Sequence, residues 1–265
     1  MAAEPEGTPC WADATFADLD AAKHFYGELL GWTYGESSPE YGNYTQAFAD
    51  GKAVAALMPP PPGHDVPSAW CLYLASPDAA ATAARIREHG GTVLVEPMQV
   101  GEFGTMVVAS DPGGAVFGVW QPGSHQGFEA RNVPGAYSWA EIFTREPEKA
   151  DAFFPAVFGY GVKRMEDDAV DFTLYDLGAD PVLGRMKMTE DFPPEVPPYL
   201  NVYFTVDDCD AAVAKAQSLG ATLRFGPLTI PFGRFAALTD PQGAPFSLID
   251  GTTTGGDMPT LTDVS

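Results

Sequence analysis

Apolar and polar residues alternate near the start of the chain, and a helical pattern follows directly. Residues 10–15 read CWADAT, so the two faces of a strand at this place would carry different side chains. Asp18 and Asp20 stand where a helix can be capped, and Gly31 stands where it can end. The apolar residues between them have the spacing of one helix face: Ala22, Phe25, Tyr26, Leu29 and Leu30. The pattern predicts a strand followed by an amphipathic helix.

The same pattern returns in the second half of the chain. Trp139 and Glu141 lie 128 positions after Trp11 and Asp13, in the segment PGAYSWAEIFTREPEKADAFFPAVFGY. A second segment, FGTMVVASDPGGAVFGVW, returns 129 positions later as FGRFAALTDPQGAPFSLI. Solenoid repeats have periods of roughly 20–50 residues, so a period this long indicates a duplicated domain.

The order strand, helix and further strands is predicted four times, twice in each half. We expect an N-terminal tail at 1–7 and a first domain at 8–121. A linker rich in Gly, Ser, Asn and Pro is predicted at 122–133, before a second domain at 134–251. The remaining residues, 252–265, are predicted to be disordered.

Composition narrows the possible partners. The 265 residues include 36 acidic and 14 basic side chains, which gives a net charge of −22. Nucleic acids and anionic membranes are poor partners for such a chain, because phosphate contacts need clustered Lys and Arg. The three cysteines have no paired spacing, and no apolar run is long enough to span a bilayer. A soluble, cytoplasmic protein with a small-molecule ligand is expected.

Two recurring motifs carry a family resemblance. The first and third predicted helices contain FY or FF and end in LG or FG, and the second and fourth units contain DPxGAxF. Their order from Thr8 to about Gly251 resembles the vicinal oxygen chelate superfamily of glyoxalases, bleomycin-resistance proteins and extradiol dioxygenases. Within it, the chain is similar to two-domain glyoxalase-like proteins of actinobacteria that are often labelled hydroxylases. The resemblance implies an α+β fold in which four βαβββ units form two tandem domains with open β cups.

The resemblance also implies a divalent metal in each cup, but the residues differ from the usual ligands. Members that bind metal commonly use a His on the first strand of a unit and a Glu on the last strand. In this chain the corresponding positions fall at Trp11, at or near Cys71, and at Gly118 in the first half, and at Trp139, Asn201 and Ser247 in the second. Since an indole cannot ligate a metal, we predict no metal cofactor and keep a divalent metal as the alternative.

The histidines are not expected to replace the missing ligands. His24 and His89 are placed on predicted helices and His125 in the linker, each as a surface residue. His64 lies in a proline-rich connector, where a loop position is favoured over a place at a cup mouth. No Ser-His-Asp or Cys-His group can be assembled from the spacing.

What remains in each cup is a set of aromatic residues around one carboxylate. The predicted lining residues are Trp11, Asp13, Tyr73 and Phe103 in the first cup, and Trp139, Glu141, Asn201, Tyr203, Phe232 and Arg234 in the second. Such walls suit a flat organic ligand with a polar or cationic group. Burial would raise the pKa of Asp13 and Glu141 towards the range of a general base, so both are predicted to be catalytic or anchoring groups. If Glu141 instead pairs with Arg234, its role is structural.

Three functions follow, and the first is favoured. It is a glyoxalase-like, metal-independent enzyme or binder that acts on a small aromatic or dicarbonyl metabolite. The second is a protein that confers resistance by sequestering an antibiotic, as bleomycin-binding relatives do. The third is a metal-dependent lyase or dioxygenase of the glyoxalase type. A monomer is preferred over a homodimer, because duplication within the chain supplies a pairing that single-domain relatives obtain by dimerising.

Overall fold

The computed structural model describes residues 4–63, 66–167 and 170–264, and the first half of this part forms one mixed β-sheet. Its strands are β1 (Pro9–Thr15), β2 (Thr33–Tyr34), β3 (Thr45–Ala49), β4 (Lys52–Met58), β5 (Ala69–Ala75), β6 (Thr92–Val100), β7 (Gly104–Ser110) and β8 (Val116–Pro122). Their order is β2-β3-β4-β1-β5-β8-β7-β6. Because β1 pairs with both β4 and β5, the first and second units share this sheet.

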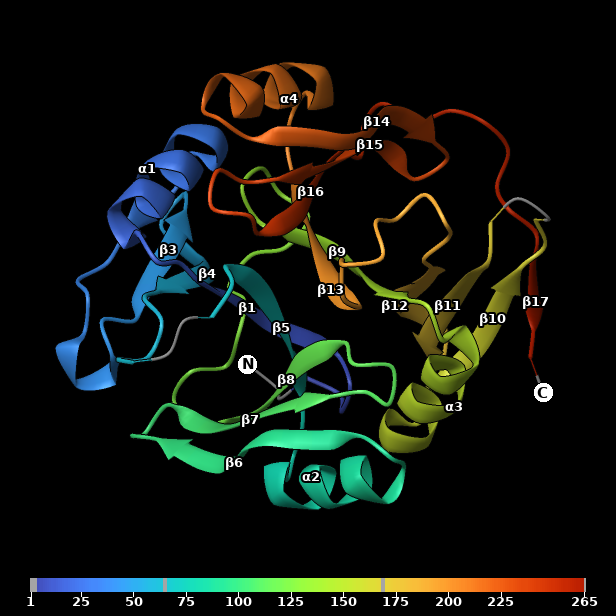
Figure 1. The fold of residues 1–265 in the computed structure, drawn as a ribbon, viewed down its shortest axis with the longest axis horizontal. Coiled ribbons are helices and arrows are strands. Elements are labelled where there is room, and N and C mark those ends of the chain that lie inside the picture. Colours follow the sequence, from blue (N-terminus) through green and yellow to red (C-terminus); the bar gives the residue numbers. More distant parts are fainter. Residues whose placement is uncertain (1–3, 64–65, 168–169, 265) are drawn as a thin grey trace.

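The second half forms the other sheet, with one strand more (Figure 1). Its strands are β9 (Tyr137–Thr144), β10 (Gly161–Met165), β11 (Phe172–Leu177), β12 (Asp180–Lys187), β13 (Tyr199–Thr205), β14 (Thr222–Ile230), β15 (Gly233–Thr239), β16 (Pro245–Asp250) and β17 (Leu261–Asp263). Their order is β14-β15-β16-β13-β9-β12-β11-β10-β17. Neighbouring units therefore pair in both halves, and the predicted α+β fold with two open-cup domains is confirmed.

The last strand corrects the prediction of a disordered tail over 252–265. β17 pairs antiparallel with β10, with Lys163 opposite Asp263 and Met165 opposite Leu261. Without this strand, β10 would be an edge strand with unpaired backbone groups, which is a ready template for another strand. The tail therefore gains order from a tertiary contact, which its own Gly- and Thr-rich sequence does not announce.

Four α-helices are present among the described residues: α1 (Leu19–Leu30), α2 (Ala79–Glu88), α3 (Pro147–Phe158) and α4 (Cys209–Ser218). Asp18 caps α1 by accepting a hydrogen bond from the Ala21 N–H at 2.9 Å. Gly31 ends α1 with a φ of 71°, a left-handed conformation that glycine adopts without steric cost. None of the described helices is long and apolar enough to cross a membrane.

The helices join the two domains through one apolar core. α1 lies beside α4, and α2 lies beside α3 (Figure 1). Tyr26 of α1 packs against Phe246 of the second domain, and its hydroxyl donates to Asp240 at 2.9 Å. Phe154 of α3 packs against Phe117 of β8, with ring centroids 5.4 Å apart. Each odd-numbered helix thus packs against the sheet of its own domain and sends aromatic rings into the other domain, which leaves the opposite faces of the sheets as the cups.

Candidate functional site

The centre of the first cup is built by β1 and β5. Their antiparallel register places Trp11 opposite Tyr73 and Asp13 opposite Cys71. Tyr73 is in turn opposite Gly118 on β8. Because side chains two positions apart share one face of a strand, Trp11, Asp13 and Tyr73 lie together, as the alternation predicts.

Asp13 in this cup is closed off from solvent. Its residue is 3% exposed, and the Tyr44 hydroxyl donates to its carboxylate at 3.3 Å. The Trp11 indole N–H donates to the Tyr44 hydroxyl at 2.7 Å. Burial raises the pKa of Asp13 to about 7, and hydrogen bonds from Tyr73 and Tyr44 oppose this rise. The carboxyl group is therefore held in a sealed aromatic site.

The linker between the domains closes the first cup and corrects the placement of His125 on the surface. The His125 ring stands edge-on to Trp11 with centroids 4.4 Å apart, and Phe128 packs against Trp11 at 5.6 Å. The Trp120 indole donates to the His125 carbonyl at 3.0 Å. Partial burial lowers the pKa of His125. No local pattern announces this contact, because it depends on the path of the linker.

The other histidines keep the roles predicted for them or lie outside the described residues. His24 on α1 and His89 at the end of α2 are both exposed. His64, which the sequence places in the proline-rich connector, lies outside the described residues. No described histidine approaches the second cup as a ring contact or ion-pair partner.

The centre of the second cup repeats this arrangement on β9 and β13. Trp139 is opposite Tyr203, and Glu141 is opposite Asn201. The Tyr203 hydroxyl donates to Glu141 Oε2 at 2.8 Å, and the Asn201 amide donates to Ser247 Oγ at 2.8 Å. Tyr203, Asn201 and Ser247 are buried, whereas Trp139 and Glu141 are only half-buried. Glu141 is therefore less enclosed than Asp13.

Glu141 has the electrostatic environment of a general base. Burial raises its pKa to about 7, and hydrogen bonds from Tyr203 and Trp139 oppose the rise. Among the described residues, no Lys or Arg forms an ion pair with it. Burial and the nearby Glu141 charge also raise the pKa of the Tyr199 hydroxyl, which keeps it protonated as a donor near neutral pH.

Arg234 does not pair with Glu141 and does not line the cup, contrary to its predicted place. Its guanidinium donates to both carboxylate oxygens of Asp210 on α4, each at 2.8 Å. The next residue, Phe235, instead packs against Tyr203 with centroids 6.1 Å apart. Since successive strand residues point to opposite faces, Arg234 lies on the helix side of the sheet.

Phe103 and Phe232 also lie apart from the residues around the carboxylates. Each precedes the first glycine of a strand at the turn of a hairpin, and they are 40% and 54% exposed. Phe103 packs against Tyr41 of the 3-10 helix η1 (Pro39–Tyr41), with centroids 5.6 Å apart. The structure therefore does not bring these two predicted lining residues next to Asp13 or Glu141.

Several rings of the second cup were missed by the sequence interpretation. Phe143 and Tyr199 stack at 5.0 Å with an interplanar angle of 4°. Phe143 lies two positions after Glu141, and Tyr199 lies two positions before Asn201, so each is on the same strand face as a predicted lining residue. Extending the alternation by one step along each strand would have predicted both. A Cβ on Gly184 would lie 2.8 Å from both Glu141 and the Phe172 ring, so these two side chains pack over Gly184. That contact requires knowledge of the strand register.

The residues at the expected metal positions do not fit a metal of the superfamily type. The part of the chain that the structure describes has no group of three or more His, Cys, Asp or Glu side chains able to hold a metal ion. A Cβ on Gly118 would lie 2.2 Å from the Tyr73 ring, so that ring occupies the space a Glu side chain would need. In the second cup, Asn201 and Ser247 bond to each other, and the Trp139 indole has no lone pair to offer.

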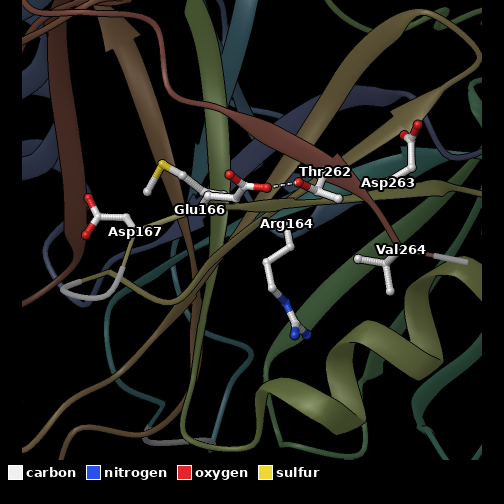
Figure 2. A pocket seen from close by; sticks show the side chains of 7 residues that line it. Arg164, Glu166, Asp167, Thr262, Asp263 and Val264 are labelled. Carbon is white, nitrogen blue, oxygen red and sulfur yellow. Dashed lines mark hydrogen bonds between the residues drawn. The ribbon is translucent and has the colours of Figure 1, made fainter.

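A hollow of about 750 Å³ lies elsewhere on the molecule, at the edge where β10 and β17 pair (Figure 2). Its lining residues are Arg164, Met165, Glu166, Asp167, Thr262, Asp263 and Val264. Thr262 donates a hydrogen bond to Glu166 across it, as the dashed line in Figure 2 shows. Neither cup carboxylate lines this hollow, and it offers no aromatic wall.

The fold and the two cups define a tandem-domain α+β protein with one closed carboxylate site and one that is less enclosed. Comparison with known proteins agrees: residues 11–119 and 136–248 each match the Glyoxalase/Bleomycin resistance protein/Dioxygenase superfamily, and the chain belongs to it. The resemblance stated from the sequence motifs is thus confirmed.

Relatives match over nearly the whole chain. One is "Putative glyoxylase CFP32" of Mycobacterium tuberculosis, 39% identical over 250 residues that cover 92% of this chain and 95% of the relative. Another is "Anthracycline biosynthesis protein DnrV" of Streptomyces peucetius, 37% identical over 258 residues that cover 92% and 93%.

Solved structures share the fold at low identity. The Mn(II)-bound glyoxalase from Novosphingobium aromaticivorans has a TM-score of 0.65 at 20% identity and covers 95% of this chain and 87% of its own. The 2,3-dioxygenase LapB from Pseudomonas sp. KL28 has a TM-score of 0.66 at 13% identity and covers 97% and 95%. Both likenesses concern the fold alone.

Proposed function

We propose that this chain is a metal-independent, glyoxalase-like enzyme that acts on a small aromatic or dicarbonyl metabolite in its second cup, with Glu141 as the general base. The observation that carries the proposal is the half-buried Glu141 carboxylate, whose pKa is raised to about 7 among aromatic rings. A base with a pKa near the working pH is both ionised in a useful fraction and able to take a proton. Asp13 has a similar pKa but lies in the closed cup.

The reaction that this arrangement supports is proton abstraction from a carbon next to a carbonyl. The C–H bond breaks, its proton moves to Glu141, and the electron pair forms an enolate whose charge rests on the carbonyl oxygen. The Tyr203 hydroxyl at 2.8 Å orients Glu141, and the protonated Tyr199 hydroxyl can donate to the enolate oxygen. Where the carbon that loses its proton carries a hydroxyl group, protonation of the enolate oxygen gives an enediol. Return of the proton from Glu141 to the former carbonyl carbon, with loss of the proton from the other hydroxyl, then moves the carbonyl group to the neighbouring carbon without an external oxidant.

The substrate class follows from the walls of the cup and is supported by a relative. Trp139, Phe143, Tyr203 and Phe235 present ring faces and edges around Glu141. Such a wall favours a flat aromatic molecule over an aliphatic one. The named role of DnrV in anthracycline biosynthesis agrees with this, because anthracyclines contain fused aromatic rings.

A direct test is exchange of the α-protons of 2-hydroxyacetophenone in D₂O, followed by proton NMR. We expect the protein to accelerate the exchange and Glu141→Gln to reduce it by about 100-fold or more, the contribution typical of a positioned base. Asp13→Asn serves as the parallel variant in the other cup, and we expect it to exchange at the wild-type rate. If Glu141→Gln retains full exchange, or if Asp13→Asn alone abolishes it, the assignment to the second cup is wrong.

Sequestration of an antibiotic is the second candidate, and the net charge of −22 favours it for cationic drugs. In that case, a titration of the protein with the drug would show saturable binding, and the protein would not accelerate the exchange of α-protons. The third candidate, a metal-dependent lyase or dioxygenase, would require near-stoichiometric metal in protein purified without chelator, measured by elemental analysis.

We propose a monomer that acts in the cytoplasm on a small-molecule ligand, without nucleic acid or membrane as a partner. The four units pair within one chain, and α1 and α3 each contact a helix of the other domain, which supports the proposal that the contacts of a dimer are already made. Light scattering after size-exclusion chromatography tests the oligomeric state. The 22 excess negative charges support the absence of phosphate-bearing partners.

A further inference from the structure

The first cup holds an internal phenol that bridges its tryptophan and its carboxylate. The Tyr44 hydroxyl accepts from the Trp11 indole N–H at 2.7 Å and donates to Asp13 at 3.3 Å. The Tyr44 hydroxyl thus provides a hydrogen-bond partner for two polar groups that would otherwise be buried without it among aromatic rings. Tyr44 immediately precedes β3, and its half-buried ring reaches across the cup face of the sheet.

The second cup keeps the tryptophan and the carboxylate but lacks the phenol. The position 128 residues after Tyr44 is Phe172, at the start of β11. Its ring packs with Glu141 over Gly184, in the sheet position that follows from the repeat. Phe172 can fill apolar space there, but it cannot donate a hydrogen bond to Glu141, and the Trp139 indole donates to Glu141 directly. One hydroxyl of the first cup therefore has no counterpart in the second.

We propose that the second cup binds a neutral hydroxyaromatic ligand whose hydroxyl takes the place that the Tyr44 hydroxyl has in the first cup. The ligand hydroxyl donates to Glu141, to which the Trp139 indole already donates. This inference rests on the proposed function, since it takes the second cup as the ligand site, and it adds the polar group that the ligand must carry. The ligand ring lies against the rings of the cup wall.

The first cup also indicates how a ring can sit on the tryptophan. His125 stands edge-on to Trp11 at 4.4 Å with an interplanar angle of 86°, and its ring comes from the linker. After the last strand of the second domain, the chain does not return over the cup but forms β17, which pairs with β10. The half-buried Trp139 thus lacks an equivalent covering ring from the described part of the chain, and a ligand ring can supply it.

The charge around Glu141 excludes an anionic version of the same ligand. No described arginine forms an ion pair with Glu141, because Arg234 pairs with Asp210 and Arg145 donates to the carbonyl groups of Val196 and Pro193. Arg224, whose charge acts on the neighbouring Tyr199, donates to Thr239 Oγ1 at 2.9 Å. An aromatic carboxylate or phenolate would meet Glu141 without a compensating cation, in a chain of net charge −22. The ligand must therefore bring a hydrogen-bond donor and not a negative charge.

Equilibrium dialysis with three probes tests the proposal on the full chain near neutral pH. The probes are 2-naphthol, which is un-ionised there, 2-methoxynaphthalene, which cannot donate, and 2-naphthoate, which is anionic. We expect 2-naphthol to bind about 10-fold or more tightly than 2-methoxynaphthalene, as a hydrogen bond to a charged acceptor allows. Binding of 2-naphthoate should be weaker than either.

Two variants locate the hydroxyl. Phe172→Tyr supplies an internal phenol at the proposed place, so it should weaken 2-naphthol binding about 10-fold and abolish its advantage over 2-methoxynaphthalene. Tyr44→Phe removes the phenol of the closed first cup and should leave 2-naphthol binding unchanged. A far-ultraviolet circular dichroism spectrum checks that both variants fold.

The outcomes separate this inference from the proposed function. Equal binding of 2-naphthol and 2-methoxynaphthalene to the wild-type protein overturns the role of the hydroxyl, whatever Phe172→Tyr does. Loss of 2-naphthol binding in Tyr44→Phe alone overturns the choice of cup. Donor-dependent binding with no α-proton exchange supports the ligand class and contradicts the catalytic role of Glu141.

Discussion

The two cups begin from the same repeated sequence and end in different states. In the first, Asp13 is 3% exposed under His125, Phe128 and Tyr44. In the second, Glu141 remains half-buried, and the following chain leaves the cup to form β17. The comparison teaches that the segment after each domain decides whether its cup is open. The strands that build the cups have equivalent registers in both domains.

The closed first cup supports the proposal that only the second cup binds a ligand. Both carboxyl groups have a pKa raised to about 7 by burial, so this property alone does not favour either cup as the proposed active site. The greater exposure of Glu141 favours the second cup, because a general base must contact its substrate. We infer that the first cup contributes stability and the second contributes chemistry, and each prediction below tests one side of that division.

The largest expected effect concerns the stability of the second domain, on the side of its sheet that faces the helices. Arg185 is fully buried in the second domain, where it pairs with Asp151 and Asp171, both at 2.6 Å. The equivalent position, 128 residues earlier, is the buried apolar Leu57. Arg185→Leu should lower the free energy of unfolding by about 3 kcal/mol, because it removes the buried cation that pairs with the partly buried Asp151 carboxylate, whereas Asp171 is exposed and adds little. Urea unfolding measures this.

A double variant separates lost charge pairing from lost packing. Arg185→Leu combined with Asp151→Leu removes the innermost charge as well and should recover most of the lost stability, since apolar residues can replace a buried ion pair. If the double variant is no more stable than the single one, packing of the Arg185 side chain is the dominant contribution and the interpretation is wrong.

The pH dependence of stability should distinguish the two carboxyl groups. Asp13 ionises near pH 3.8 in the unfolded chain and near 7 in the folded one, so the folded state binds more protons between these values. Stability contributed by Asp13 is therefore present below about pH 4 and is lost as the pH rises to 7. The loss is about 2–4 kcal/mol.

Substitution should flatten this curve unequally. Asp13→Asn keeps a neutral group in the closed cup and should remove most of the fall in stability between pH 4 and 7, measured by urea unfolding at several pH values. Glu141→Gln should flatten it less, because the pKa of Glu141 rises less, from 4.5 to about 7. Equal flattening by both variants would show that the two cups are equally closed.

Much of the fold could be predicted because it is encoded locally and written twice. The alternation at residues 10–15, the caps of α1 and the 128-residue offset fix the strand, the helix and the duplication. The same alternation places Trp11 with Asp13 and Trp139 with Glu141 on one face, where the structure has them. The aromatic carboxylate centres follow directly from these facts.

The errors concern contacts that depend on position in space. Arg234 was assigned to the cup together with Phe232, but the true ring is Phe235, and a shift of one residue turns a strand side chain to the other face. The His125 contact depends on the course of the linker, and β17 depends on a free edge of β10. None of these is visible in a local period.

The smallest expected effect is on stability and concerns the last strand of each cup. Ser247 on β16 accepts a hydrogen bond from Asn201 at 2.8 Å, whereas the equivalent place on β8 is Gly118, which the Tyr73 ring covers. Ser247→Ala should therefore cost about 1 kcal/mol of stability through loss of this bond. A double-mutant cycle with Asn201→Ala in urea unfolding should give a coupling energy of similar size, because each single variant already breaks the bond. Additive effects of the two substitutions would mean that Asn201 and Ser247 stabilise the second cup independently, and that its polar floor is not a connected unit.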